Sequence, residues 1–177
     1  MIYMESNLYS IYSGDMKSGD CILWQSSRSC IGWLIQRFTA FNHASLIIRP
    51  EEFGPFKDRR FVMEAVGKGV VLRLLSEHFR EFHGKAYWYP LKDEFDSART
   101  LIAAWALAQE GTPYDYKSLF RQIFGSVSAD AELFFCSEFC YFGWRENGIP
   151  VNYAKAPRPG DIPNLNIFKK PILIFEG

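Results

Sequence analysis

Short strand-like segments separated by turns fill residues 21–89, and they constrain the fold more than any other feature of the sequence. The segments are rich in β-branched and aromatic residues, and Gly or Pro turns lie between them. A further edge strand is predicted close to the end of the chain. A run of antiparallel strands flanked by helices predicts an α+β fold. The predicted strands are residues 21–24, 44–48, 60–66, 70–74, 85–89 and 172–175.

Helical patterns lie between the first two strand-like segments and between the fifth and the sixth. Ser29 can cap a helix whose apolar residues recur at helical spacing up to position 38. A second helix is predicted to open at Asp96 and to end at Gly111, before a proline. A shorter helix is expected at residues 116–124, and the last one is expected to begin near Cys136 and to end by Gly148.

Length and charge narrow the classes of protein to which the chain can belong. A chain of 177 residues without a repeat or linker predicts a single domain over residues 1–177. Its 20 basic and 20 acidic residues give no net charge, which argues against nucleic-acid binding. Residues 1–16 lack Lys and Arg, and the longest apolar run, residues 101–108, is too short to span a bilayer. We therefore expect no transmembrane segment and a cytoplasmic location.

The four cysteines are expected to be free thiols. Cys21, Cys30, Cys136 and Cys140 do not have the spacing of a zinc ribbon. A chain of this length can also bury an adequate core without disulfides or a structural metal. Neither a metal nor another cofactor is expected.

Three segments carry residues that an ordinary core does not require. His43 stands at the start of an apolar strand, within Asn42-His43-Ala44-Ser45. Glu64 interrupts an otherwise apolar strand. Cys136 follows an aromatic pair at the point where a helix is expected to start. These three residues are the candidate catalytic group.

Together, the three side chains would form a thiol-dependent catalytic site. A cysteine in the first turn of a helix is stabilised as thiolate by the helix dipole, and a neighbouring imidazole takes its proton. Glu64 would hold the second ring nitrogen of His43. The backbone N–H of Cys136 is expected to bind the oxyanion, together with either Gln25 or Tyr114.

Each of these residues also has an ordinary structural interpretation. A strand histidine is often only hydrogen-bonded, a cysteine among phenylalanines is often an inert buried thiol, and a strand glutamate often faces solvent. His78 and His83 lie among charged residues, which indicates a solvated face.

The remaining cysteines leave other interpretations open. Cys21 and Cys140 are expected to pack in the core, whereas Cys30 lies near a predicted helix start and is a rival nucleophile. A metal site built from Cys136, Cys140 and His43 is an alternative, although no fourth ligand is evident.

Taken in order, the segments resemble a known family. The order is Gly19-Asp20 before a strand, a Ser-rich turn and helix, then His43, then Glu64, and finally Cys136-Ser137-Glu138-Phe139. This resembles the permuted papain-like cysteine hydrolases, the YiiX/YaeF branch of the NlpC-type superfamily, over residues 18–161. In that branch the histidine precedes the cysteine along the chain, as it does here.

The resemblance implies a fold and a set of roles. It implies a circularly permuted papain-like fold, in which the cysteine helix packs against a small antiparallel sheet. It also implies Cys136 as nucleophile, His43 as base and Glu64 as the residue that orients the base.

The expected function is hydrolysis of an amide or ester bond through an acyl-enzyme on Cys136. The acyl substrate is expected to be a peptide, a peptidoglycan fragment, a lipid or another small molecule. One alternative is an acyltransferase of the same fold, and another is a binding module without catalysis. A homodimer is compatible with the aromatic content, and residues 117–131, with Phe120 and Phe124, are expected to line or cover the cleft.

Overall fold

A computed structural model describes residues 8–26, 40–50, 54–66, 69–112, 131–151 and 157–177, with the side chains of 131–135 excepted. A six-stranded antiparallel sheet of order β4-β3-β2-β1-β5-β6 forms its centre. This confirms the predicted α+β class. The strands are β1 (Cys21–Ser26), β2 (His43–Ile48), β3 (Phe61–Val66), β4 (Gly69–Leu74), β5 (Gly84–Tyr89) and β6 (Ile172–Glu176).

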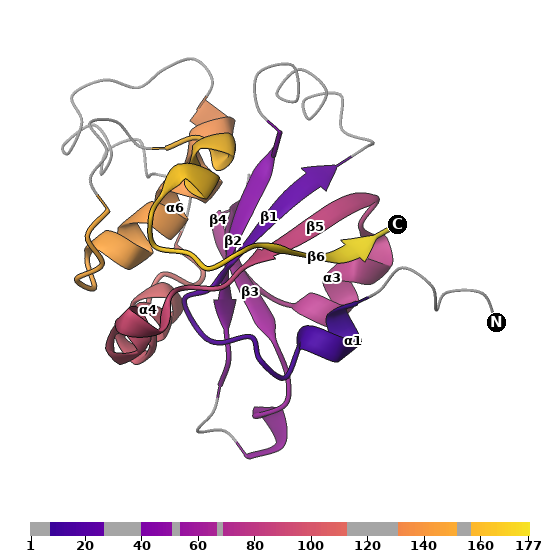
Figure 1. Cartoon of the computed structure of the whole chain (residues 1–177), viewed down its shortest axis with the longest axis horizontal. Coiled ribbons are helices and arrows are strands. Elements are labelled where there is room, and N and C mark those ends of the chain that lie inside the picture. The colour runs from indigo at the N-terminus through magenta and orange to yellow at the C-terminus, as the bar shows by residue number, and fades with distance from the viewer. Residues whose placement is uncertain (1–7, 27–39, 51–53, 67–68, 113–130, 152–156) are drawn as a thin grey trace.

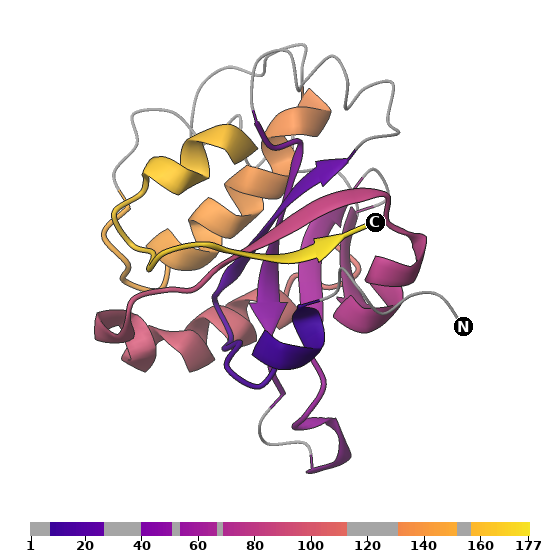
Figure 2. The ribbon, with the colours of Figure 1, turned by 45° about the vertical axis from the view of Figure 1, so that its right-hand side comes forward.

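Helices cover both faces of the sheet. The helices α4 (Arg99–Leu107) and α6 (Ala131–Arg145) lie on one side, and α1 (Tyr9–Tyr12) and α3 (Leu75–Glu81) lie on the other (Figure 1, Figure 2). Two apolar clusters result, because successive strand residues point to opposite faces. Short 3-10 turns occupy Gly54–Phe56, Asp93–Ala98 and Pro159–Asn164. None of the helices in the described ranges has the length and apolar character that would be needed to cross a bilayer.

The six predicted strands are all present, but two helix starts differ from the prediction. The helix expected from Asp96 begins at Arg99, because the preceding residues form a 3-10 turn. The helix expected to begin near Cys136 begins at Ala131. No glycine or proline separates Ala131 from Cys136, so nothing in this segment stops the helix from extending toward the N-terminus. The helices predicted after Ser29 and at 116–124 lie outside the described residues.

The helix α3 is absent from the sequence prediction. Leu75 and Phe79, four residues apart, are 0% and 5% exposed and anchor the helix on the sheet. The charged residues between and after them had indicated a solvated face. That interpretation is wrong for His78, whose side chain is only 14% exposed.

A close contact brings α6 against the sheet. At Gly143, a Cβ atom would lie 2.8 Å from Leu46 Cδ1 on β2 and 3.2 Å from a ring carbon of Trp105 on α4. Only glycine allows this approach without displacement of its neighbours. The helix that carries Cys136 is thereby held close to the strand that begins with His43.

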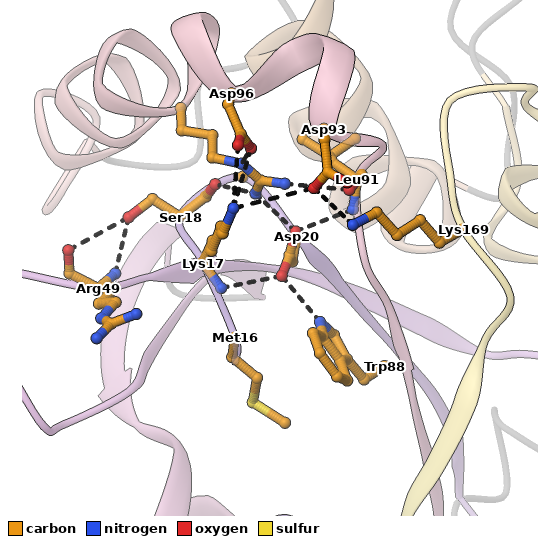
Figure 3. A network of polar contacts seen from close by, with 12 residues as sticks. Met16, Lys17, Ser18, Asp20, Arg49, Trp88, Leu91, Asp93, Asp96 and Lys169 are labelled. Atoms are coloured by element: carbon orange, nitrogen blue, oxygen red, sulfur yellow. Dashed lines mark hydrogen bonds and ion pairs between the residues drawn. The ribbon is translucent and has the colours of Figure 1, made fainter. Parts of the chain in front are cut away.

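A buried acid fixes the start of β1 (Figure 3). Asp20 is 1% exposed, and its carboxylate accepts hydrogen bonds from Leu91 N, Arg99 Nη1, Trp88 Nε1 and Lys17 N at 2.7–3.0 Å. Gly19 has a φ of 86°, and its N–H donates to Ile47 O. The Gly-Asp pair therefore ties β1 to β2, β5 and α4.

Candidate active site

His43 and Glu64 meet where β2 and β3 lie side by side. Leu46 pairs with Met63, and this register sets Ser45 opposite Glu64, with His43 on the same face two residues away. His43 Nε2 lies 2.5 Å from Glu64 Oε2. The imidazole is 25% exposed, whereas the carboxylate is 1% exposed. The structure therefore contradicts the alternative that Glu64 faces solvent.

Buried groups hold the carboxylate of Glu64 in place. Ser45 Oγ donates to Glu64 Oε2 at 3.1 Å, and Trp24 Nε1 donates to Ser45 Oγ at 2.8 Å. Burial alone would raise the pKa of Glu64. The charge and hydrogen bond of His43, helped by His78, outweigh burial and hold the pKa well below its usual range. Glu64 is therefore an anion at neutral pH.

Cys136 reaches His43 from the opposite face of the sheet. Met63 and Ala65, which flank Glu64, belong to the same apolar cluster as Cys136, so Glu64 itself points to the α3 side. His43 stands at the end of its strand, where both faces are within reach, and a side-chain hydrogen bond joins it to Cys136. Because Nε2 faces Glu64, Nδ1 is the nitrogen left for the thiol. Cys136 is 2% exposed.

The electrostatics of His43 favour its charged form. Burial opposes the imidazolium, but the charges and hydrogen bonds of Cys136 and Glu64 outweigh it and raise the pKa of His43 to about 10. At neutral pH the imidazole therefore carries two protons, one toward each partner. Such an arrangement can hold a thiolate–imidazolium pair, which is the reactive form of a cysteine nucleophile.

The position of Cys136 in α6 corrects two predictions. Cys136 is the sixth residue of Ala131–Arg145 and not part of the first turn. Its N–H therefore lies beyond the four unbonded amides at the start of a helix, so it is not free to bind an oxyanion. The dipole effect also falls off after the first turn. Stabilisation of a thiolate at Cys136 must come chiefly from His43.

Some of the other residues that the sequence singled out lie in the described part of the chain, and the rest lie outside it. Cys21 and Cys140 are fully buried and share a side-chain hydrogen bond, which confirms their packing role. The three described cysteines, Cys21, Cys136 and Cys140, are free thiols. Four further residues that the sequence singled out lie outside the described residues: Tyr114, Cys30, Phe120 and Phe124. Within the described part of the chain, no group of three or more His, Cys, Asp or Glu residues is placed to hold a metal ion, so the alternative metal site has no support there.

Sequence reasoning missed three residues around Glu64. Ser45 could have been found, because it follows His43 by two positions in a strand and so shares its face. Trp24 could not have been found, because its contact with Ser45 depends on the register of the strands. His78 could not have been found either, because it lies on a helix that the sequence pattern did not predict.

The comparisons with known proteins concern the family and the fold of the chain. Residues 15–164 match a family described as permuted papain-like amidase enzymes, YaeF/YiiX, C92 family. The chain belongs to this family. The match confirms the resemblance seen in the sequence and the expectation of a cysteine hydrolase of the amidase type. A search of curated proteins gave no match.

A solved structure supports the fold of this permuted papain-like family member. The structure is described as that of the metalloprotein yiiX from Escherichia coli O157:H7, and it matches with a TM-score of 0.55 and 21% sequence identity. The match covers 75% of this chain and 66% of that one, so the chain spans about two thirds of the length of yiiX. The likeness confirms the permuted papain-like fold.

Replacing Glu64 with Gln should lower the pKa of His43 while leaving the shape of the site intact. Glutamine removes the negative charge that faces Nε2, and loss of an adjacent opposite charge typically shifts a pKa by about 1–3 units. The titration of His43 should be followed by NMR. Glu77→Gln is the matched control, because Glu77 is exposed and pairs with Arg80. An unchanged His43 titration in Glu64→Gln would show that the carboxylate does not stabilise the imidazolium.

Proposed function

We propose that this chain hydrolyses an amide or ester bond through an acyl-enzyme on Cys136, with His43 as base and Glu64 orienting the base. One observation carries the proposal: the two nitrogens of a single imidazole are engaged by a thiol and by a buried carboxylate. The amidase description of the family favours an amide as the first substrate class to test.

The proposed reaction has two halves. The Cys136 thiolate attacks the carbonyl carbon, and His43 Nδ1–H then protonates the leaving amine or alcohol as the bond to it breaks. The acyl group remains on sulfur as a thioester. His43, now neutral, takes a proton from water, and the resulting attack releases the acid and restores the ion pair. Glu64 retains its charge and holds the ring throughout.

Gln25 is the proposed oxyanion donor among the described residues. It follows Cys21 and Leu23 on alternate positions of β1, and both belong to the apolar cluster that contains Cys136. The side chain of Gln25 therefore shares the α6 face with the nucleophile. Its neighbour Trp24 pairs with His43, so Gln25 lies at the same end of the sheet as the imidazole. An amide N–H at this place can stabilise a developing oxyanion.

Acyl-enzyme trapping tests the proposal directly. The protein would be incubated with panels of 4-nitrophenyl esters and 4-nitroanilides of acetyl, longer acyl and aminoacyl groups, and intact mass would be recorded at short times. We expect one added acyl group, located on Cys136 by peptide mapping, and its disappearance as free acid is released. Cys136→Ala should abolish the adduct, whereas Cys21→Ala should not, because Cys21 is fully buried in the core.

The outcomes separate the functional classes. An adduct that persists in water and is discharged by added amines or alcohols would point to acyl transfer. The absence of any adduct across both panels, together with an unreactive Cys136, would contradict the hydrolase proposal and favour a binding module.

A further inference from the structure

Two buried polar atoms face one another behind the site. Glu64 Oε1 and His78 Nδ1 are both buried without a formal hydrogen bond, and they lie 3.5 Å apart. A buried polar atom without a hydrogen bond is unfavourable, so a small approach that joins the two atoms is favoured. His78 is the natural donor, because an ionised carboxylate can only accept.

His78 is held firmly enough to act on its neighbour. It lies on α3 beside the buried Phe79, and its ring stacks on Trp24 with centroids 4.3 Å apart and an interplanar angle of 24°. Trp24 in turn donates to Ser45, which donates to the other oxygen of Glu64. His78 therefore reaches the carboxylate by two routes, directly at Oε1 and through Trp24 and Ser45 at Oε2.

We propose that His78 is a positioning residue that donates its Nδ1–H to Glu64 Oε1 and so fixes the carboxylate with Oε2 aimed at His43. The inference rests on the proposed function, because it assigns His78 a role in holding the Cys136–His43–Glu64 group. A carboxylate bonded at one oxygen only can rotate about its last bond. A donor on the second oxygen prevents this rotation and so keeps Oε2 aligned with His43 Nε2.

The other charged groups near Glu64 are less suited to this task. Arg73 Nε on β4 lies 3.4 Å from the same oxygen, but its side chain is 48% exposed, so water screens its charge. On α3 itself, Glu77 and Arg80 pair with each other at the surface, and Glu81 is exposed. Tyr9 of α1 and Phe175 of β6 contact Phe79 on this helix. Of these groups, His78 is the buried donor that faces Oε1.

Two substitutions at His78 separate positioning from packing. His78→Asn places an amide N–H near the position of Nδ1 but loses the stacked ring. His78→Phe retains a ring on Trp24 but loses the donor. The readout is the rate of Cys136 alkylation by iodoacetamide at pH 6 relative to its plateau at high pH, with thermal unfolding recorded for each variant. His83→Phe is the matched control, because His83 is exposed.

We expect the two variants to differ in the relative rate of Cys136 alkylation at pH 6. Residues that orient a reacting ligand from outside typically contribute about 10–100-fold, and we expect His78→Phe to lose about tenfold in the relative rate at pH 6. His78→Asn should stay within about twofold of the wild type by the same measure, because the donor is retained. A purely structural role predicts the reverse order, with the Phe variant unaffected, and that result would overturn the proposal.

A second measurement keeps the inference separate from the proposed function. NMR of the wild-type protein should show His78 with its proton on Nδ1, protected from exchange with solvent. A His78 that carries its proton on Nε2 alone would overturn the inference while leaving the hydrolase proposal intact. A wild-type Cys136 whose reactivity does not depend on His43 would instead contradict the proposed function, whatever the state of His78.

Discussion

Replacing His43 with Ala is expected to make the alkylation of Cys136 by iodoacetamide strongly dependent on pH. In the wild type the pKa of His43 is raised to about 10, so the proposed ion pair places an imidazolium beside Cys136 across the neutral range. The rate should therefore change little between pH 6 and pH 8. Without His43, the thiol loses the imidazole that is hydrogen-bonded to it.

The size of the change follows from the behaviour of an ordinary thiol. A cysteine of pKa about 8.5 is only about 0.3% thiolate at pH 6, so the variant should react about 300-fold more slowly at pH 6 than at its own plateau. Comparing each protein with its own plateau removes differences in intrinsic nucleophilicity, which falls as thiol pKa falls.

The cysteines that are fully buried serve as internal controls for this experiment. Cys21 and Cys140 have no exposed surface, and burial raises the pKa of Cys140, so neither should be labelled while the protein is folded. His83→Ala removes an exposed histidine and should leave the profile unchanged. A steep pH profile in the wild type itself, or labelling of Cys30 in preference to Cys136, would contradict the assignment of the nucleophile.

The strands and the residues of the candidate catalytic group could be predicted from the sequence because their signals are local. Period-2 patterns and turn residues mark β2 and β3, and they set His43 and Glu64 at ends and faces that a short sheet brings together. The chain order of histidine, glutamate and cysteine then provided the resemblance that joined Cys136 to the other two. Each of these inferences needed only a few neighbouring residues.

The residues that hold the carboxylate of Glu64 could not be predicted from the sequence, because their contacts depend on strand register and on one short helix. Trp24 reaches Ser45 across two paired strands, and a shift of one residue would turn either side chain to the opposite face. The charged residues of α3 conceal an apolar pair, Leu75 and Phe79, that is too short a repeat to show helical periodicity. His78 was therefore assigned to solvent, although it packs against Trp24.

The start of α6 shows a different limit of prediction from the sequence. The aromatic pair before Cys136 suggested a boundary, but helix starts are fixed by capping and by the absence of breakers more than by a change of composition. The consequence is chemical as well as structural. With Cys136 in the second turn, the helix dipole contributes little at the sulfur, so the proposed ion pair depends on His43.

Removing the carboxylate of Asp20 is expected to destabilise the whole fold and to leave the chemistry of the site unchanged. In Asp20→Ala the guanidinium of Arg99, with a side chain only 9% exposed, loses its buried counter-ion. The indole N–H of Trp88 and the N–H of Leu91 lose their acceptor at the same time. Breaking a buried ion pair by removing one partner typically costs about 3–5 kcal/mol, which is a large part of the stability of a domain.

Urea unfolding of Asp20→Ala and of Asp93→Ala measures this effect against a matched control. Asp93 also pairs with lysines, but it is 67% exposed, so its replacement should cost less than about 1 kcal/mol. The alkylation profile of Cys136 in the folded fraction of Asp20→Ala should match that of the wild type, because Asp20 lies at the opposite end of β1 from Trp24 and Gln25. A loss below about 1 kcal/mol for Asp20→Ala would mean that water or backbone rearrangement replaces the carboxylate. A changed alkylation profile would mean that the Gly-Asp pair, at the start of the strand, also governs the geometry of the site at the other end.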